Sequence, residues 1–229
     1  MNLLIVDKII ELYNPKNSAV DSAYLYLSNA RKACSSFFEL FNSIRKTRKA
    51  RGTPNDTEQD LLRAMLIFSA SGLDSTLKEL IKKSLKPVIK NDEGAKDVFQ
   101  TWISKNIYRN ENLDSEMLVK ALVADSSLDA LISILIDKLT ANSLQSAEEI
   151  FKVGALFNIP TKDLTSDNQK LKDIFKVRNE IAHELDIDLT LRNRSRFQRR
   201  KGIMLDYTND IFRVSNNFIK EVDKKIGAT

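Results

Sequence analysis

The chain has 229 residues, 42% of them hydrophobic and 29% charged, and its six Gly and four Pro supply few of the turns that strands and hairpins need. This composition favours an all-α globular protein with enough chain to bury a core. A single cysteine, Cys34, and a single histidine, His183, exclude an intramolecular disulfide framework and a Cys/His zinc cluster. The net charge of +5 is mild, so the distribution of charge is more informative than the total.

The first segment, residues 1–12, is apolar but is interrupted by Asp7, Lys8 and Glu11, so we expect an amphipathic helix there. It lacks the basic leader and the small-residue cleavage site of a signal peptide. No stretch of the sequence approaches the about 20 uninterrupted apolar residues that a membrane span needs. The default compartment is therefore the cytoplasm.

A long helix is predicted over about residues 18–49, because apolar side chains recur at helical spacing and Gly52 and Pro54 follow. Its C-terminal end carries a concentration of basic residues with no acidic residue among them. These residues are Arg45, Lys46, Arg48, Lys49 and Arg51. Such a run is suited to contacts with phosphate.

The next helix is expected to be capped by Asp56 or Thr57 and to end at about Lys86, before Pro87. Its apolar face is almost unbroken along this length. Small side chains occupy its centre at residues 69–72, where a second helix or another copy of the chain could approach closely.

From about residue 91 to 160 the pattern changes to three shorter apolar-periodic segments separated by polar turns. They cover residues 98–107, 127–139 and 146–159. We interpret this region as a helical insert, or as an elaboration of one end of a bundle. The whole chain, residues 1–229, then forms one domain with core helices within about 18–86 and 166–226.

The only histidine lies in a helix predicted over about residues 167–184, which follows a capping-box sequence that begins at Ser166. At about 100° per residue, Asn179 and His183 project side by side, whereas Arg178 lies near the middle of the apolar stripe. Because unpaired burial of a charge is too costly, Arg178 must reach a carboxylate, a cleft or a second subunit.

An irregular segment is expected over about residues 185–202, followed by a final helix over about residues 203–226. Six of the ten residues from 192 to 201 are basic and none is acidic. These candidate phosphate-binding residues are Arg192, Arg194, Arg196, Arg199, Arg200 and Lys201. The alternatives are a solvated charge run and a site for any polyanion, because clustered charge sets affinity more than identity.

The run R-N-E-I-A-H-E-L-D-I-D, with the basic segment and closing helix behind it, resembles the R-N-x-x-x-H signature of the HEPN superfamily. It is most similar to the RiboL-PSP-type branch, as is the earlier segment L-L-R-A-M-L-I-F-S-A-S-G-L-D-S-T-L-K-E-L. The likeness covers about residues 56–86 and 166–226. It implies an all-α HEPN-like bundle and a dimeric ribonuclease whose site residues are Arg178, Asn179 and His183.

The resemblance also implies that the helix of residues 56–86 packs beside the helix that carries the motif. Asp74 interrupts the apolar pattern of that helix, so it is the candidate partner of Arg178. The alternative is an exposed carboxylate on an ordinary helix.

RNA cleavage without a metal needs a base for the ribose 2′-hydroxyl, a cation for the phosphate oxygens and an acid for the leaving oxygen. His183 suits the first or the third task, but one imidazole cannot perform both at once. We therefore expect a homodimer that joins two copies of the motif. The predicted function is a metal-independent endoribonuclease without a cofactor, with RNA and an antitoxin or regulatory protein as partners, in a toxin or phage-defence setting.

Two other functions stay open. A non-catalytic RNA-binding module would keep the basic segment, with His183 forming only a hydrogen bond near a helix end. A helical interaction scaffold would use residues 69–72 as a docking face. The sequence contains no G-x-S-x-G elbow and no Gly-rich phosphate loop, which argues against serine hydrolase and nucleotide-loop chemistry.

Overall fold

The computed structural model describes residues 8–49, 52–108 and 115–227, and in these residues the chain is all-α. A 3₁₀ turn at Ser18–Val20 leads into the first helix. The helices are α1 (Asp21–Thr47), α2 (Asp56–Asn91), α3 (Glu93–Tyr108), α4 (Ser115–Leu122), α5 (Ser127–Ala141), α6 (Ala147–Leu156), α7 (Thr161–Leu164), α8 (Asn168–Glu184) and α9 (Lys201–Gly227). Extended pairing within these ranges is confined to an isolated bridge between Ile187 and Arg196.

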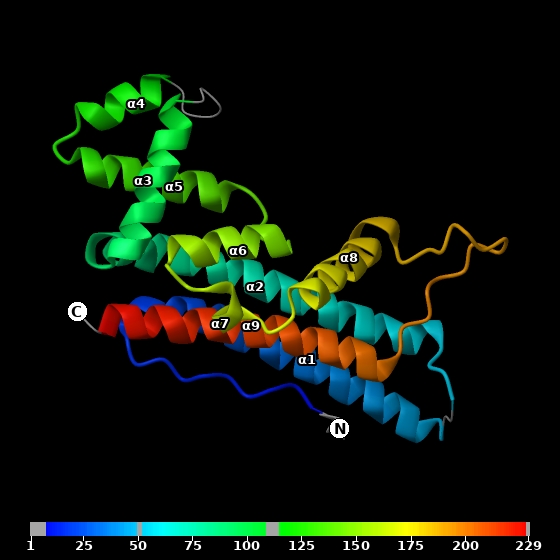
Figure 1. The fold of residues 1–229 in the computed structure, drawn as a ribbon. Helices are drawn as coiled ribbons and strands as arrows, with labels where there is room; N and C mark the ends of the chain where they lie inside the picture. Colours follow the sequence, from blue (N-terminus) through cyan, green and yellow to red (C-terminus); the bar gives the residue numbers. More distant parts are fainter. Residues whose placement is uncertain (1–7, 50–51, 109–114, 228–229) are drawn as a thin grey trace.

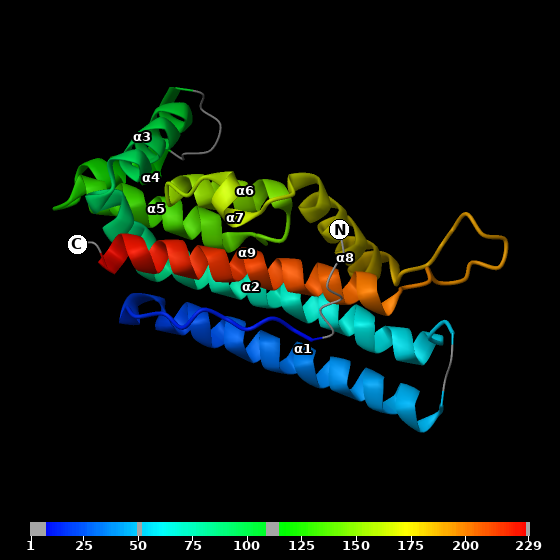
Figure 2. The same ribbon diagram turned by 60° about the horizontal axis from the view of Figure 1, so that its bottom comes forward.

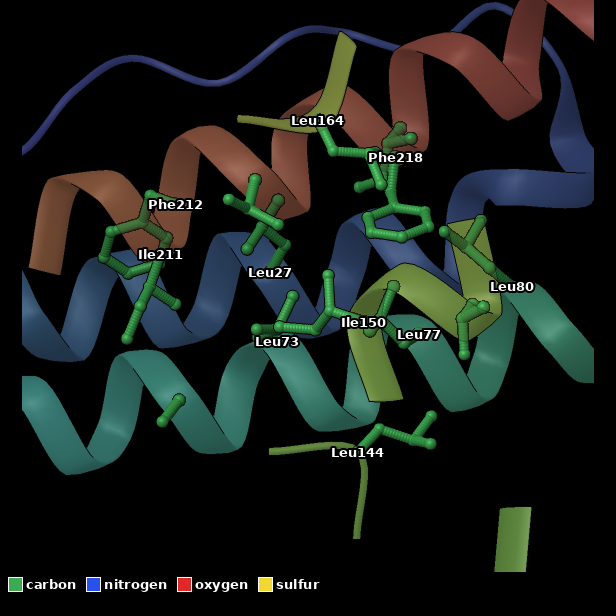
Figure 3. Close-up of a cluster of buried hydrophobic side chains, with 14 of the residues drawn as sticks. Leu27, Leu73, Leu77, Leu80, Leu144, Ile150, Leu164, Ile211, Phe212 and Phe218 are labelled. Atoms are coloured by element: carbon green, nitrogen blue, oxygen red, sulfur yellow. The ribbon is translucent and has the colours of Figure 1, made fainter. Parts of the chain in front are cut away.

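Helices α1, α2 and α9 lie side by side along the length of the molecule (Figures 1 and 2). Each buries an apolar stripe at helical spacing against the other two. Figure 3 shows side chains of all three helices packed together with Leu144, Ile150 and Leu164 from the region between α5 and α8. Because full burial of a Leu, Ile or Phe side chain contributes about 1.5–3 kcal/mol, this cluster dominates the stability of the bundle.

The small residues at the centre of α2 accommodate α1. A Cβ atom added at Gly72 would lie 2.3 Å from the Cβ of Ala30 on α1. Ser69 and Ala70 are fully buried as well. The close approach expected from the sequence is therefore made by a helix of the same chain, and the scaffold hypothesis loses the exposed face on which it depended.

Helix α2 differs from its predicted bounds at both ends. The cap is Asn55, whose side chain accepts from the Glu58 N–H while the Glu58 carboxylate accepts from the Asn55 N–H. The helix also continues through Pro87 for another turn. The lost hydrogen bond at the proline is offset because Val88 and Ile89 are buried, at 3% and 1% exposure, against the rest of the core.

The helix predicted over residues 1–12 is wrong for the part that the structure describes, and residues 1–7 lie outside the described residues. Residues 8–17 instead run without helical structure alongside α9. Their backbone donors bind a ladder of polar side chains on α9 at two-turn spacing. Asn209 accepts from Ile10 N at 3.0 Å, and Asn216 accepts from Tyr13 N at 2.6 Å. Asp223 accepts from both Lys16 N and Asn17 N at 2.9 Å. These hydrogen bonds to α9 take the place of the backbone hydrogen bonds that the predicted helix would have formed.

The region of residues 91–160 is helical as predicted, but it contains more helices than the three expected segments. Helix α4 is the one that the sequence analysis did not predict. Helices α3, α4 and α5 project from one end of the bundle in Figure 1, whereas α6 lies along it. None of the helices in the described part of the chain has the length and hydropathy that crossing a membrane requires.

Candidate functional site

Helix α8 presents the R-N-x-x-x-H residues because its opposite face is tied to the bundle. Its N-cap is Asp167, one residue after the predicted Ser166, and Asp167 Oδ1 accepts from Lys170 N at 2.8 Å. The buried face consists of Leu171, Ile174, Phe175 and Ile181. Asn179 and His183 are exposed, and Arg178 is half-buried between the two faces. The helical spacing thus delivers these three side chains to one end of α8.

The guanidinium of Arg178 contacts both other motif residues. Its Nη1 donates to the Asn179 Oδ1 at 2.9 Å and lies 3.5 Å from the His183 Nε2. A guanidinium has only donors, so Nε2 accepts from it in the tautomer of His183 that carries its proton on Nδ1. The arrangement can therefore hold a cation and an acceptor nitrogen against the same substrate group.

Among the residues that the structure describes, no carboxylate forms an ion pair with Arg178. Burial lowers the pKa of Arg178, and the nearby carboxylate of Asp74 counteracts part of this effect. The Nε atom is buried and has no hydrogen-bond partner among the described residues. A buried donor in this state is costly, because it has lost its hydrogen bond to water without gaining another.

Asp74 lies close enough to act on Arg178 electrostatically, but the ion pair expected from the sequence is not formed. Its Oδ2 pairs with Lys78 one turn along α2 at 2.9 Å. Its Oδ1 accepts from the backbone N–H of Leu144 at 2.7 Å. Asp74 therefore holds the segment before α6 against α2, and the charge of Arg178 remains available.

The end of α8 is fixed by an unusual backbone turn. Leu185 and Asp186 both adopt left-handed conformations, with φ of 53° and 61°, although neither is glycine. The Asp186 N–H donates to the Glu180 carbonyl at 3.0 Å and closes the helix. This reversal of the backbone leaves Leu185 66% exposed.

A buried carboxylate maintains this turn. The Asp186 side chain is fully buried and accepts from Arg63 Nε at 2.6 Å and from Arg199 Nε at 3.0 Å. Arg199 Nη2 also contacts Asp186 and pairs with Glu180 of α8 at 2.9 Å. Three chain segments therefore meet at Asp186, three residues after His183.

Residues Arg63 and Asp186 were not predicted as part of the site. Both lie within the stretches that resemble the HEPN branch, but nothing in their local pattern links them. Arg63 is 2% exposed, and its Nη2 donates to the carbonyl of Phe197 at 2.9 Å. One signal was available in the sequence. An arginine on the apolar face of α2 is expected to be buried, and a buried arginine needs a carboxylate partner from elsewhere in the chain.

The basic segment divides into two groups in the structure. Arg192, Arg194 and Arg200 are exposed, in a segment that projects from the end of the bundle (Figure 2). Arg199 serves the Asp186 cluster, and Arg196 pairs with Asp60 at 2.6 Å, so both maintain the fold. Lys201 Nζ lies 5.0 Å from the centroid of the Phe38 ring.

Metal ligands are not grouped near these residues. Among the residues that the structure describes, no three His, Cys, Asp or Glu side chains are arranged to hold a metal ion. Cys34 is buried in the core, which raises the pKa of its thiol to about 12 and leaves it unreactive.

Comparison with known proteins identifies one family. The model of the RiboL-PSP-HEPN family matches residues 28–228, which include α8, the basic segment and the whole region of residues 91–160. Families of the HEPN superfamily often have ribonuclease or other RNA-related functions. Neither the curated proteins nor the solved structures contain a match to this chain.

Proposed function

Because the chain belongs to the RiboL-PSP-HEPN family, we propose that it is an endoribonuclease that cleaves RNA without a metal ion. The observation that carries the proposal is the contact of the Arg178 guanidinium with both Asn179 and His183 at the end of α8. Its positive charge is not paired with a carboxylate among the described residues, so it is free to bind phosphate.

In the proposed reaction, His183 Nε2 accepts the proton of the ribose 2′-hydroxyl. The 2′-oxygen forms a bond to the adjacent phosphorus while the bond from phosphorus to the 5′-oxygen breaks. A second imidazole, in its protonated form, gives a proton to the departing 5′-oxygen. The products are a 2′,3′-cyclic phosphate and a 5′-hydroxyl.

Arg178 would donate to the phosphoryl oxygens as negative charge develops on them. Asn179 accepts from the same Nη1 that lies near His183, so the amide restricts where the charge lies relative to His183. Each of the three motif residues thus has a separate role in the proposed reaction, and the geometry of the site supports these roles.

The second imidazole would come from a second copy of the chain in a two-fold homodimer. One feature at the end of α8 supports this, since the apolar side chain of Leu185 is 66% exposed two residues after His183. Light scattering should then give twice the chain mass of 26.1 kDa.

By analogy with the family, we propose a toxin or phage-defence setting, with an antitoxin or regulatory protein as a further partner. The RNA target would be held by exposed arginines of the segment before α9. A non-catalytic RNA-binding module is the second candidate, because Arg192, Arg194 and Arg200 are exposed independently of His183.

The test is incubation of purified protein with labelled RNA in excess chelator. We expect cleavage by the wild type, and a loss of about 100-fold or more in rate for Arg178→Ala and His183→Ala. Lys83→Ala is the control, since Lys83 is an exposed residue of α2 that lies about 13.5 Å along the helix from Asp74, at 1.5 Å per residue. Binding without cleavage would support the RNA-binding module instead.

A further inference from the structure

The two basic runs of the sequence meet in one groove, although more than half of the chain separates them. Arg45, near the end of α1, lines this groove together with Arg199, Arg200 and Lys201, which lead into α9. Thr53 and Gln198 complete its polar rim, and its volume is about 640 Å³. This is within the range of about 300–1,000 Å³ that ligand sites occupy.

Buried polar side chains hold the walls of the groove in place. Gln59 is fully buried, and its Nε2 donates to the carbonyl of Pro54 on one wall at 2.8 Å and to Gln198 on the other at 3.0 Å. Its Oε1 accepts from the backbone N–H of Arg199 at 2.5 Å. The groove is therefore a built feature of the fold, not a gap between loops.

Positive charge exceeds negative charge along the groove. Glu58 is 1% exposed and pairs with Arg45 at 3.1 Å and with Arg48 at 2.9 Å, so one carboxylate serves two guanidiniums. Arg200 is exposed and has no ion-pair partner among the described residues. The positive end of the α9 dipole adds to this charge, since α9 begins at Lys201.

The groove is connected to the motif through Arg199. The backbone of Arg199 forms part of the groove wall, whereas its side chain binds Asp186 and Glu180 at the end of α8. Glu180 directly follows Asn179 in that helix. Arg199 thus joins the groove wall to the end of the helix that carries Arg178 and His183.

We infer that this groove binds the phosphodiester backbone of single-stranded RNA and anchors the strand beside the cleavage site. The inference rests on the proposed function for the identity of its ligand. The phosphate oxygens would contact Arg200 and Lys201, without reading the bases. Arg45, whose Nη1 donates to Glu58 and whose Nη2 donates to the Gly52 carbonyl, would form the opposite wall. The inference predicts an affinity for RNA that falls as the salt concentration rises and that does not depend on the chemistry at His183.

The experiment uses the full chain with His183→Ala, so that the RNA stays intact, and measures fluorescence anisotropy of a labelled single-stranded RNA at several salt concentrations. Adding Arg200→Ala and Lys201→Ala should weaken binding about tenfold and make the log–log salt slope shallower by about 1.4, because each lost phosphate contact removes about 0.7. The matched control is Lys82→Ala with Lys83→Ala, which removes two exposed charges from α2. Circular dichroism would verify that both proteins are folded.

Unchanged affinity and salt slope in the groove variant would overturn the inference, as would the absence of RNA binding by the parent protein. Inorganic phosphate and a 5′-mononucleotide are tested as competitors. Displacement of the RNA by either at equal concentration would assign the groove to a free phosphate compound instead. If the wild type binds RNA through the groove but never cleaves it, the nuclease proposal fails and the groove stands.

Discussion

The guanidinium of Arg178 donates a hydrogen bond of 2.9 Å to the amide oxygen of Asn179, its neighbour in the chain. Adjacent residues of an α-helix project about 100° apart, so this bond requires the arginine to turn along the helix surface. The same Nη1 then lies 3.5 Å from His183, which follows Asn179 by one turn. Asn179 therefore positions the cation of the proposed site.

Replacing Asn179 by aspartate tests this role with almost no change in shape. In Asn179→Asp the new carboxylate would pair with Arg178 and neutralise the guanidinium charge that binds phosphate in the proposed site. We expect single-turnover RNA cleavage to fall about 100-fold, as when one transition-state donor is lost. Asn179→Ala should lower the cleavage rate less, because it leaves the charge of the guanidinium unpaired. A lower rate for Asn179→Asp than for Asn179→Ala would support the positioning role of Asn179. An Asp variant as active as wild type would exclude this role.

The Asp186 cluster predicts a large loss of stability from a single neutral substitution. Asp186→Asn leaves the guanidiniums of Arg63 and Arg199 without their shared buried carboxylate. Breaking such a pair from one side costs about 3–5 kcal/mol, so the free energy of unfolding in urea should fall by about this amount. Asp173→Asn removes an exposed carboxylate from α8 and should change it by less than about 0.5 kcal/mol. Equal stability of the two variants would contradict the interpretation.

The sequence predicted the helices whose signals are local and strong. The apolar stripes of α1, α2, α8 and α9 and the one-turn spacing of Asn179 and His183 repeat within a few residues, and the structure confirms them as helical features. The HEPN resemblance is confirmed by the family match over residues 28–228. The catalytic roles of these residues stay predictions.

Local patterns failed where distant partners decide the structure. Residues 8–12 have amphipathic spacing, but the N–H groups of Ile10 and of Tyr13 just after them donate to Asn209 and Asn216, about 200 positions further along the chain. Arg196 and Arg199 look like any other members of a basic run. Their assignment to the fold depends on Asp60 and Asp186, which no pattern of charge within residues 192–201 could reveal.

The division of the basic segment predicts opposite outcomes for two arginines. Arg194 is exposed and has a positive φ of 48° at the projecting turn, so Arg194→Ala should weaken RNA binding and make the salt slope shallower by about 0.7 without loss of stability. Arg199→Ala should instead destabilise the chain, because Asp186 and Glu180 lose their partner. RNA anisotropy and urea unfolding of both proteins would test this. Similar behaviour of the two variants would contradict the division.

The close contact of α1 and α2 predicts that a methyl group added at Gly72 lowers stability. Moving the methyl group from Ala30 to Gly72 should have little effect on stability. Gly72→Ala places a Cβ 2.3 Å from the Cβ of Ala30, and such overpacking costs about 1–3 kcal/mol. Adding Ala30→Gly transfers the methyl group from one helix to the other and should recover most of the lost stability. Thermal unfolding of the single and double variants measures both effects. A destabilised double variant would show that the fit depends on which helix carries the methyl.

The ladder on α9 predicts a pH dependence of stability through Asp223. Burial acts to raise the pKa of the Asp223 carboxyl, but the N–H groups of Lys16 and Asn17 and the hydroxyl of Tyr13 outweigh it and hold the pKa below its usual range. A lowered pKa in the folded state gives stability that is present above the unfolded value of about 3.9 and is lost as the pH falls toward the folded value.

Asp223→Asn should therefore be less stable than the wild type in urea at pH 7. The difference should narrow below about pH 4, because the Asp223 carboxyl of the unfolded wild-type chain then takes up a proton before that of the folded chain does. The surface variant Asp173→Asn serves as the reference, because Asp173 lies on the exposed face of α8. Its difference from the wild type should stay small across the same pH range. A gap for Asp223→Asn that is as wide at pH 3 as at pH 7 would mean that the side chain holds the N-terminal segment by its shape and not by its charge.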